Sequence, residues 1–122
     1  MFAAGRCSAA DPARGARIYA ERCIACHSID VNRTGPAHCG LFARISGTAP
    51  GFKNYSRPMR DARIRWSEAT LLVFLKSPTT AVPGTSMTYN GIADAGERAD
   101  LAAWLKQATS AQKCALKTGD GS

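Results

Sequence analysis

The stretch Cys23-Ile24-Ala25-Cys26-His27 decides how this chain folds. Two cysteines three positions apart, followed directly by a histidine, form the pattern to which a c-type haem is attached through thioether bonds. The histidine of such a pattern lies beneath the iron as its first axial ligand. The sequence therefore predicts one covalently bound haem c, held by Cys23 and Cys26 and ligated by His27.

Two other kinds of site use similar residues, a redox-active dithiol and one half of a structural zinc site. A thioredoxin-like dithiol follows a strand, whereas the residues before Cys23 have the pattern of a helix. A structural zinc site needs four ligands, and the chain has no second Cys-x-x-Cys. Haem attachment is the interpretation that fits.

The length of the chain, 122 residues, is that of one small domain, and no apolar stretch is long enough to span a bilayer. We expect an N-terminal tail over 1–10, a domain over 11–109 and a C-terminal tail over 110–122. In so short a chain a buried macrocycle would supply much of the apolar core. The protein without haem is therefore expected to fold poorly.

Five cysteines in a chain of this length indicate an oxidising compartment. After Cys23 and Cys26 are assigned to haem, Cys7, Cys39 and Cys114 are left, which allows one bridge and one free thiol. We favour the pair Cys39 and Cys114, which would tie the loop beneath the haem to the tail and could stabilise the fold by about 4 kcal/mol. The first residues lack the apolar segment of a signal peptide. We therefore expect a mature form in the bacterial periplasm, in preference to the mitochondrial intermembrane space.

Three segments have the periodicity of amphipathic helices. The first is expected to begin with Asp11 as N-cap and Pro12 in the first turn and to bury the face formed by Ala16, Tyr19, Ala20 and Cys23. The second begins after Ser67 and ends before Pro78, and its apolar stripe consists of Leu71, Phe74 and Leu75. The third begins near Ala95, and its stripe consists of Leu101, Trp104, Leu105 and Ala108.

The stretches between these helices, 28–65 and 78–94, are rich in Gly, Pro, Asn and Thr and are expected to be irregular, with no strand. Loops of that length need something to wrap around, and a haem is such an object. The second axial ligand is best supplied by Met87, because a soft thioether favours ferrous iron. Met59 and His38 are the alternatives.

The motifs, in their order, resemble those of the class I cytochromes c of mitochondrial and bacterial type over residues 11–109. The resemblance implies an all-α cytochrome c fold, with three main helices and long loops wrapped around one haem. Gly15 would let the first and last helices cross closely, with Tyr19 packed near Leu101 and Trp104. The matching motifs are Gly15-Ala16-Arg17-Ile18-Tyr19, Gly35-Pro36, Gly40-Leu41-Phe42-Ala43-Arg44, Trp66-Ser67-Glu68, Pro83-Gly84-Thr85-Ser86-Met87, Gly91-Ile92 and Glu97-Arg98-Ala99-Asp100-Leu101.

The resemblance also implies how the haem would be held. The carbonyl oxygen of Pro36 would accept the second imidazole N–H of His27, which fixes the ring and its tautomer. A buried propionate would receive hydrogen bonds from three side chains. The further cofactor-binding residues are thus Arg44, Tyr55 and Trp66, together with Thr85 beside Met87.

Two positions depart from the family pattern. Phe74 stands where many members have a tyrosine that hydrogen-bonds the methionine sulfur, so that bond is expected to be absent. His38-Cys39 stands where the pattern has an apolar residue and a histidine that braces two loops. A disulfide at Cys39 would replace that brace.

The chain is basic, with 16 Lys and Arg against 9 Asp and Glu and a formal net charge of +7. No nucleic-acid-binding signature accompanies the charge, which indicates either a solvated face or acidic redox partners such as a membrane cytochrome complex, an oxidase, a reductase or a dehydrogenase. We expect a monomer that does not insert into membranes. Five of the cations crowd one segment, at Lys53, Arg57, Arg60, Arg63 and Arg65.

The function that the resemblance implies is one-electron transfer, with both axial positions of the iron filled and no catalytic residues. A module of a larger oxidase or dehydrogenase would keep that function. The alternative from another class is a haem-based gas sensor or a peroxidase-like enzyme. Such a protein needs an open or labile position on the iron and a polar distal pocket.

Overall fold

Helix α1 (Pro12–Arg22) begins where the sequence predicts, because the Asp11 carboxylate accepts hydrogen bonds from the backbone N–H groups of Ala13 and Arg14. It is the first of five helices in the computed structural model, which describes residues 9–110 and 113–114. The other four are α2 (Arg57–Ala62), α3 (Glu68–Lys76), α4 (Pro78–Ala81) and α5 (Ala95–Ala108).

The buried face of α1 differs from the prediction in one respect. Ala20 is exposed and Ala16 only half-buried, whereas Gly15, Ile18 and Tyr19 are buried. Positions i, i+3 and i+4 share one side of a helix, so this side is centred one residue earlier than expected. The cause is Gly15, whose missing side chain lets α1 approach its partner there.

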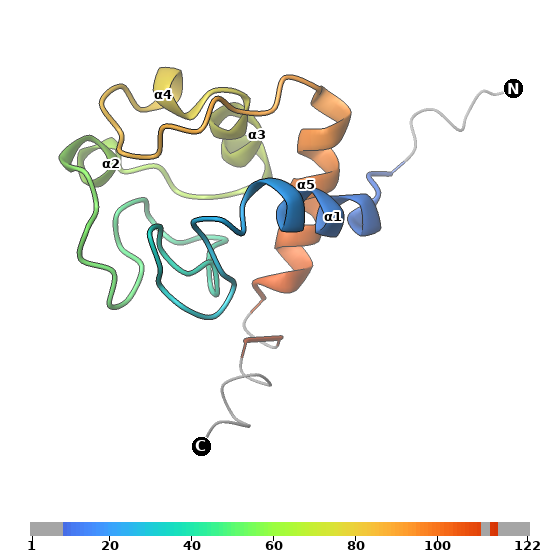
Figure 1. Ribbon diagram of the computed structural model, residues 1–122, viewed down its shortest axis with the longest axis horizontal. Coiled ribbons are helices and arrows are strands. Elements are labelled where there is room, and N and C mark those ends of the chain that lie inside the picture. The colour runs from blue at the N-terminus through green and yellow to red at the C-terminus, as the bar shows by residue number, and fades with distance from the viewer. Residues whose placement is uncertain (1–8, 111–112, 115–122) are drawn as a thin grey trace, which may run out of the picture.

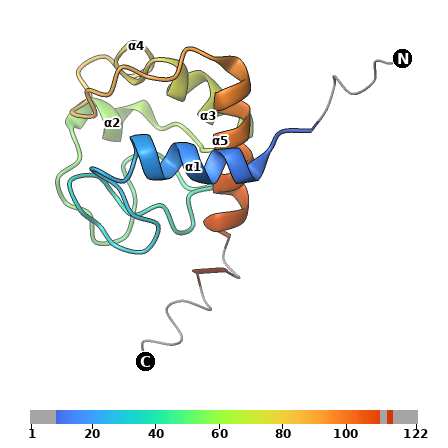
Figure 2. The ribbon, with the colours of Figure 1, turned by 45° about the vertical axis from the view of Figure 1, so that its right-hand side comes forward.

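Helices α1 and α5 cross in contact with each other, and the crossing is visible from two directions (Figures 1 and 2). A Cβ atom on Gly15 would collide with the backbone carbonyl of Asp100 and with Cβ of Trp104. The Asp100 carboxylate accepts hydrogen bonds from the Asp11 backbone N–H at 2.8 Å and from Arg14 Nε at 2.5 Å. The close approach and this half-buried ion pair together fix the angle at which the chain enters the next segment.

Helix α3 follows the prediction closely, with Ser67 and Thr70 forming a capping box at its start. Its buried side chains are Leu71, Phe74 and Leu75, the predicted stripe. Pro78 does end α3 but also opens the short helix α4, because proline is favoured at the first position of a helix. Both α4 and α5 pack on α3.

The stretch 28–65 contains one helix that the sequence analysis missed. Helix α2 has Ser56 as N-cap, whose hydroxyl accepts from the Met59 backbone N–H at 3.3 Å, and Pro58 in its first turn. The pair Ser56 and Pro58 was a readable start signal. Elsewhere the described part of the stretch is irregular, with an isolated antiparallel bridge between Ile45 and Arg65. The predicted all-α architecture with long loops is confirmed.

Parts of the predicted organisation lie outside the described residues. These include Cys7 and most of the two expected tails. Within the described residues, no helix has the length and apolar character needed to cross a membrane.

Candidate haem-binding site

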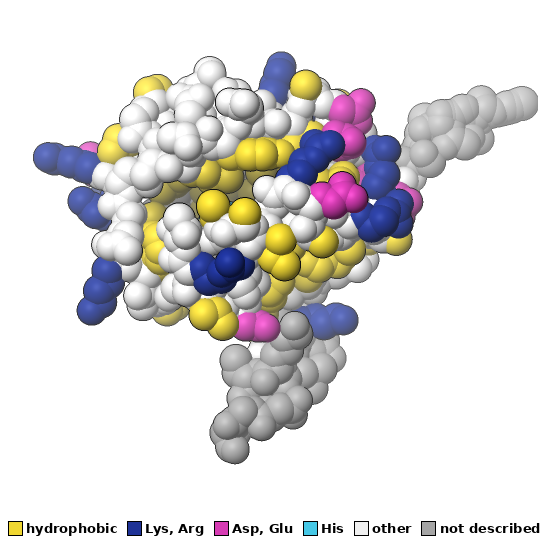
Figure 3. All heavy atoms as spheres, viewed as in Figure 1, with side chains coloured by type: hydrophobic (Ala, Val, Ile, Leu, Met, Phe, Trp, Pro, Cys, Tyr) yellow, Lys and Arg dark blue, Asp and Glu magenta, His cyan; other side chains and the backbone are white. Residues whose placement is uncertain are grey.

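A cavity of about 480 Å³ opens between the α1–α5 crossing and the long loops. Its walls come from the end of α1, from α2, α3 and α5, and from the loops between them. Figure 3 shows the hollow on one face of the molecule with an apolar floor. Cavities of this size, lined by apolar side chains with a few polar groups, are typical of cofactor sites.

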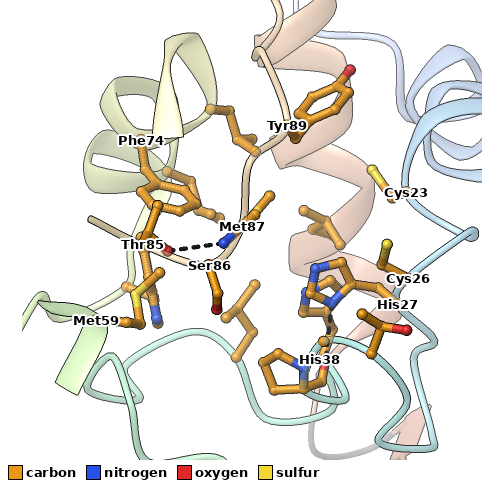
Figure 4. Close-up of a pocket in the computed structure, with 18 of the residues that line it drawn as sticks. Cys23, Cys26, His27, His38, Met59, Phe74, Thr85, Ser86, Met87 and Tyr89 are labelled. Atoms are coloured by element: carbon orange, nitrogen blue, oxygen red, sulfur yellow. Dashed lines mark hydrogen bonds between the residues drawn. The ribbon is translucent and has the colours of Figure 1, made fainter. Parts of the chain in front are cut away.

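Cys23 and Cys26 lie at the edge of this cavity, directly after α1, and their sulfur atoms point into it (Figure 4). Neither is part of a disulfide. The turn that carries them is closed by hydrogen bonds from the backbone N–H groups of Cys26 and His27 to the carbonyl of Cys23, at 3.1 and 2.9 Å. Burial raises the pKa of the Cys23 thiol to about 11, whereas Cys26 is exposed.

The His27 ring is held by the loop that follows. Its Nδ1 lies 3.0 Å from the carbonyl oxygen of Pro36, and because a carbonyl only accepts, Nδ1 carries the proton and donates. Nε2 is then the nitrogen with a free lone pair. A Cβ atom on Gly35 would collide with this ring, so the loop can approach His27 only through a glycine. Burial also lowers the pKa of His27, which keeps the imidazole neutral.

Arg33 contributes to the same turn, and the sequence analysis missed it. Its Nη1 donates to the carbonyl oxygens of Ile24 and His27, at 2.5 and 3.2 Å, and its Nη2 donates to that of Ala25 at 3.4 Å. These carbonyls belong to the Cys23–His27 motif itself. A lone arginine in a loop gives no pattern from which this contact could have been read.

The sequence analysis considered His38 as an alternative ligand and as a departure from the family pattern, and the structure places it beside His27. The centroids of the two imidazole rings are 4.3 Å apart and their planes differ by 24°. The Tyr19 hydroxyl and His38 Nδ1 form a hydrogen bond of 2.9 Å. Burial lowers the pKa of His38 well below its usual value, so this second imidazole is neutral. The signal in the sequence that could have indicated this contact is that a histidine stands where the family pattern has an apolar residue.

Met87 reaches the cavity from the segment that faces His27 (Figure 4). Its backbone N–H donates to the Thr85 hydroxyl at 3.2 Å, and Thr85 is buried. Met59, the other candidate thioether, also lines the cavity, from the buried side of α2. The structure thus brings both methionines to one cavity, while His38 lies with His27.

The three side chains expected at a propionate line this cavity as well. Two nitrogens of Arg44 donate to the carbonyls of Cys39 and Ala37, each at 3.0 Å, and burial lowers the pKa of this guanidinium. The Tyr55 hydroxyl accepts from the Ala49 backbone N–H at 3.1 Å, which leaves its own proton to donate. Trp66 is buried edge-to-face against Phe74, with 5.1 Å between the ring centroids, and within the described residues its indole N–H has no protein acceptor.

The two remaining described cysteines are close together. The structure joins Cys39 and Cys114 through their sulfur atoms, with their Cα atoms 5.9 Å apart. The bond connects the loop after His38 with the segment that follows α5.

The donor set fits a haem better than a bare metal ion. A neutral imidazole, a thioether and two free thiols surround an apolar cavity, which matches covalent attachment of a macrocycle and soft axial ligation of its iron. Within the described residues, no three His, Cys, Asp or Glu side chains gather as the ligands of a structural metal ion would.

Comparison with known proteins agrees with this class of site. A protein-family model described as cytochrome c matches residues 12–109. The chain is 43% identical over 104 residues to a cytochrome c of Chlamydomonas reinhardtii, an alignment that covers 83% of this chain and 92% of the relative. It is 39% identical over 102 residues to a cytochrome c of Ulva intestinalis, covering 81% and 91%, and 37% identical over 100 residues to cytochrome c 2.1 of Caenorhabditis elegans, covering 80% and 89%.

The fold and the site define a c-type haem protein without strands in its described part. The chain belongs to the cytochrome c family. It therefore binds one covalent haem c and acts in electron transfer, as a carrier and not as an enzyme. These relatives are eukaryotic and give no support to the predicted bacterial periplasm.

Proposed function

We propose that this protein carries one electron at a time on a haem whose axial ligands are His27 and Met87. The observation that carries the proposal is the His27 tautomer, because the bond from Nδ1 to the Pro36 carbonyl leaves Nε2 free to coordinate. Met87 lines the same cavity from the facing segment. When bound, the haem supplies an iron that exchanges between ferric and ferrous states, and two filled positions suit a carrier better than a sensor or peroxidase.

The other parts of the chain have supporting roles in this proposal. Cys23 and Cys26 would hold the porphyrin as thioethers. Arg44, Tyr55 and Trp66 would stabilise a buried propionate, since an unpaired charge in an apolar site is costly. The Cys39–Cys114 bridge would hold the loop that carries the Pro36 carbonyl and His38.

An optical spectrum of ferric and ferrous holoprotein tests the ligand set. We expect sharp low-spin c-type bands and the weak red band of methionine sulfur on ferric iron. The variant Met87→Ala should lose the red band and bind carbon monoxide, while Met59→Leu, a change of similar volume in the same cavity, should keep it. A parent spectrum that is high-spin and binds carbon monoxide would instead support the sensor or peroxidase-like alternative.

For partners, we propose acidic redox proteins that meet the cations near α2. The side chains of Lys53, Arg57, Arg60 and Arg63 are exposed. Helix α2 carries Met59 inward and Arg57 and Arg60 outward, with Lys53 before it and Arg63 at its end. In the described part of the chain, Arg57 has an acidic neighbour, Asp61 at 3.5 Å, but both side chains are largely exposed and the pair is weak. Positive potential beside the cofactor would raise the rate of encounter with an anionic partner.

The rate at which ferricyanide, a small anionic oxidant, oxidises the ferrous protein tests this surface. Changing Arg57, Arg60 and Arg63 together to glutamine should lower the rate severalfold at low salt and little at high salt, where the charges are screened. The control is Arg17→Gln, an exposed arginine on α1, outside the cluster of cations near α2. The same loss per charge removed in both variants would show that only net charge matters. The compartment that we propose is an oxidising one. The bacterial periplasm stays a prediction, which cell fractionation would test.

A further inference from the structure

His38 lies against the ring that the proposed function assigns to the iron, and the Cys-x-x-Cys-His motif does not account for it. The two imidazole rings are stacked, with 4.3 Å between their centroids. The family pattern has an apolar residue at this position, so close packing alone does not require an imidazole. His38 is half-buried, and a polar ring that loses part of its contact with water is costly unless it is hydrogen-bonded. Its presence here therefore calls for a partner and a role.

The partner is Tyr19, whose hydroxyl forms the 2.9 Å hydrogen bond with His38 Nδ1. Tyr19 is buried on α1 and is only 5% exposed, and its ring packs on Trp104 of α5 with 4.9 Å between centroids. It is thus fixed by the helix crossing. The hydroxyl group adds a directional contact that a phenyl ring at this position would lack.

The backbone around His38 is equally restrained. The His38 N–H donates to the Ser28 carbonyl at 3.1 Å, and the His38 carbonyl accepts from the Leu41 N–H at 2.9 Å. Next to it, the Cys39 N–H donates to the Ile29 carbonyl at 2.8 Å, and Cys39 is joined to Cys114. Both ends of the residue are therefore held, its backbone by the loop and its ring by α1.

We propose that His38, oriented by the Tyr19 hydroxyl, is a positioning residue that fixes the plane of the His27 ring and tunes the reduction potential through it. The inference rests on the proposed function, in which His27 ligates the iron. Among the described residues, the His27 ring has one hydrogen bond, at Nδ1, and a single bond permits rotation about its own direction. A flat ring stacked on His27, with its own orientation locked, opposes that rotation.

The direction of the effect on the potential follows from polarity. A ferric site has one more positive charge than a ferrous site, and a neutral but polar neighbour stabilises charge better than a hydrocarbon does. Replacing His38 by leucine should therefore favour the ferrous state. We expect the ratio of ferrous to ferric protein, at the applied potential where the parent is half reduced, to rise about threefold, as expected for the loss of one modest polar interaction.

The test uses holoprotein of the parent and of His38→Leu, Tyr19→Phe and the double variant. The midpoint potential is measured by voltammetry, and the hyperfine-shifted haem methyl resonances of the ferric protein report the orientation of the axial ligands. Tyr19→Phe should shift the midpoint potential and the methyl resonances in the same direction as His38→Leu, but by less. The double variant should match His38→Leu. Trp104→Phe is the control, because it keeps an aromatic ring against Tyr19 and leaves the Tyr19–His38 hydrogen bond in place, so it should lower only the stability.

Variants that lose stability but keep the parent's potential and methyl shifts would overturn the inference and leave His38 a packing role. If His38→Leu does not yield folded holoprotein, Tyr19→Phe decides alone, since it removes one oxygen atom and leaves the ring. A failure of the proposed function would be visible in the parent itself, as a spectrum without methionine ligation. A failure of the inference would be visible only in the difference between variants and parent.

Discussion

The two sides of the cavity are held very differently. On the His27 side, the ring has a hydrogen bond to Pro36 and a stacking contact with His38, and Arg33 binds three carbonyls of the attachment motif. The Cys39–Cys114 bridge joins this side to the segment after α5. Side chain, backbone and a cross-link thus restrain the same few residues.

On the Met87 side the restraints are fewer. The Met87 N–H donates to the Thr85 hydroxyl, and the next backbone hydrogen bond along the described chain is made by Ile92, to Leu75 at 2.8 Å. Ser86, Thr88 and Asn90 are exposed. Segments with few buried contacts and few backbone hydrogen bonds open at a lower free energy than the rest of a protein. The protein therefore positions the two proposed ligands with different firmness, and we expect the methionine to be the first to detach.

The largest effect that separates the two sides should come from a matched pair of glycine substitutions. Gly35→Ala places a Cβ against the His27 ring, so we expect almost no correctly ligated holoprotein. Gly84→Ala lies on the Met87 side, where φ is +88° and the nearest atom to the new Cβ is Cγ of Pro58 at 3.0 Å. It should cost about 1–2 kcal/mol of stability and keep the haem. Holoprotein yield and urea unfolding are measured for both variants. Equal yields from Gly35→Ala and Gly84→Ala would contradict the difference between the two sides.

Removing the disulfide should have the next largest effect. Changing Cys39 and Cys114 together to serine opens a loop whose ends are 75 positions apart, which should lower the free energy of unfolding by up to about 4 kcal/mol. Hydrogen exchange of the backbone amides distinguishes the two sides. The backbone amides at positions 39 and 41 should exchange faster, while that of Ile92 should change little. A larger change at Ile92 would mean that the bridge does not act on the His27 side.

Much of this architecture was readable from the sequence because local signals carry it. The start of α1 follows from Asp11 and Pro12, and α3 begins at its predicted cap, Ser67. The attachment motif likewise defines its own chemistry within five residues. Each of these features depends on neighbours in the chain, which a pattern can capture.

The features that were missed depend on residues far apart in the chain. Tyr19 and His38 are 19 positions apart, and their hydrogen bond exists only because the loop folds back onto α1. Arg33 reaches its carbonyls through an irregular loop whose path no periodicity predicts. Ala20 was placed on the buried side because the close approach at Gly15 shifts the contact face of the helix. Tertiary contacts of this kind override what a local pattern can indicate.

A smaller effect on the His27 side should be seen at alkaline pH. Burial raises the pKa of Tyr19, so its phenol stays neutral in the folded protein while the unfolded chain ionises above pH 10. A raised pKa of this kind stabilises the fold fully below pH 10 and progressively less above it. Between pH 10 and 11 the parent should lose about 1 kcal/mol relative to Tyr19→Phe. Urea unfolding across that range measures the free energy of unfolding of both proteins. If the difference between the two free energies does not change with pH, Tyr19 ionises in the folded state as easily as in the unfolded chain.

The smallest effect should come from the Met87 side, at Phe74. Phe74 lines the cavity and packs edge-to-face on Trp66. A hydroxyl added by Phe74→Tyr could donate to the methionine sulfur, a weak acceptor, and would draw electron density away from a bond that stabilises ferric iron. We expect the midpoint potential to rise, by a free energy of about 0.5 kcal/mol or roughly a twofold change in the ferrous to ferric ratio. Voltammetry beside the parent measures it, with Val73→Thr, an exposed change on the same helix, as the control. An unchanged or lowered potential would mean that the hydroxyl does not reach the sulfur, and that the Met87 side is too loosely held for one added donor to act on it.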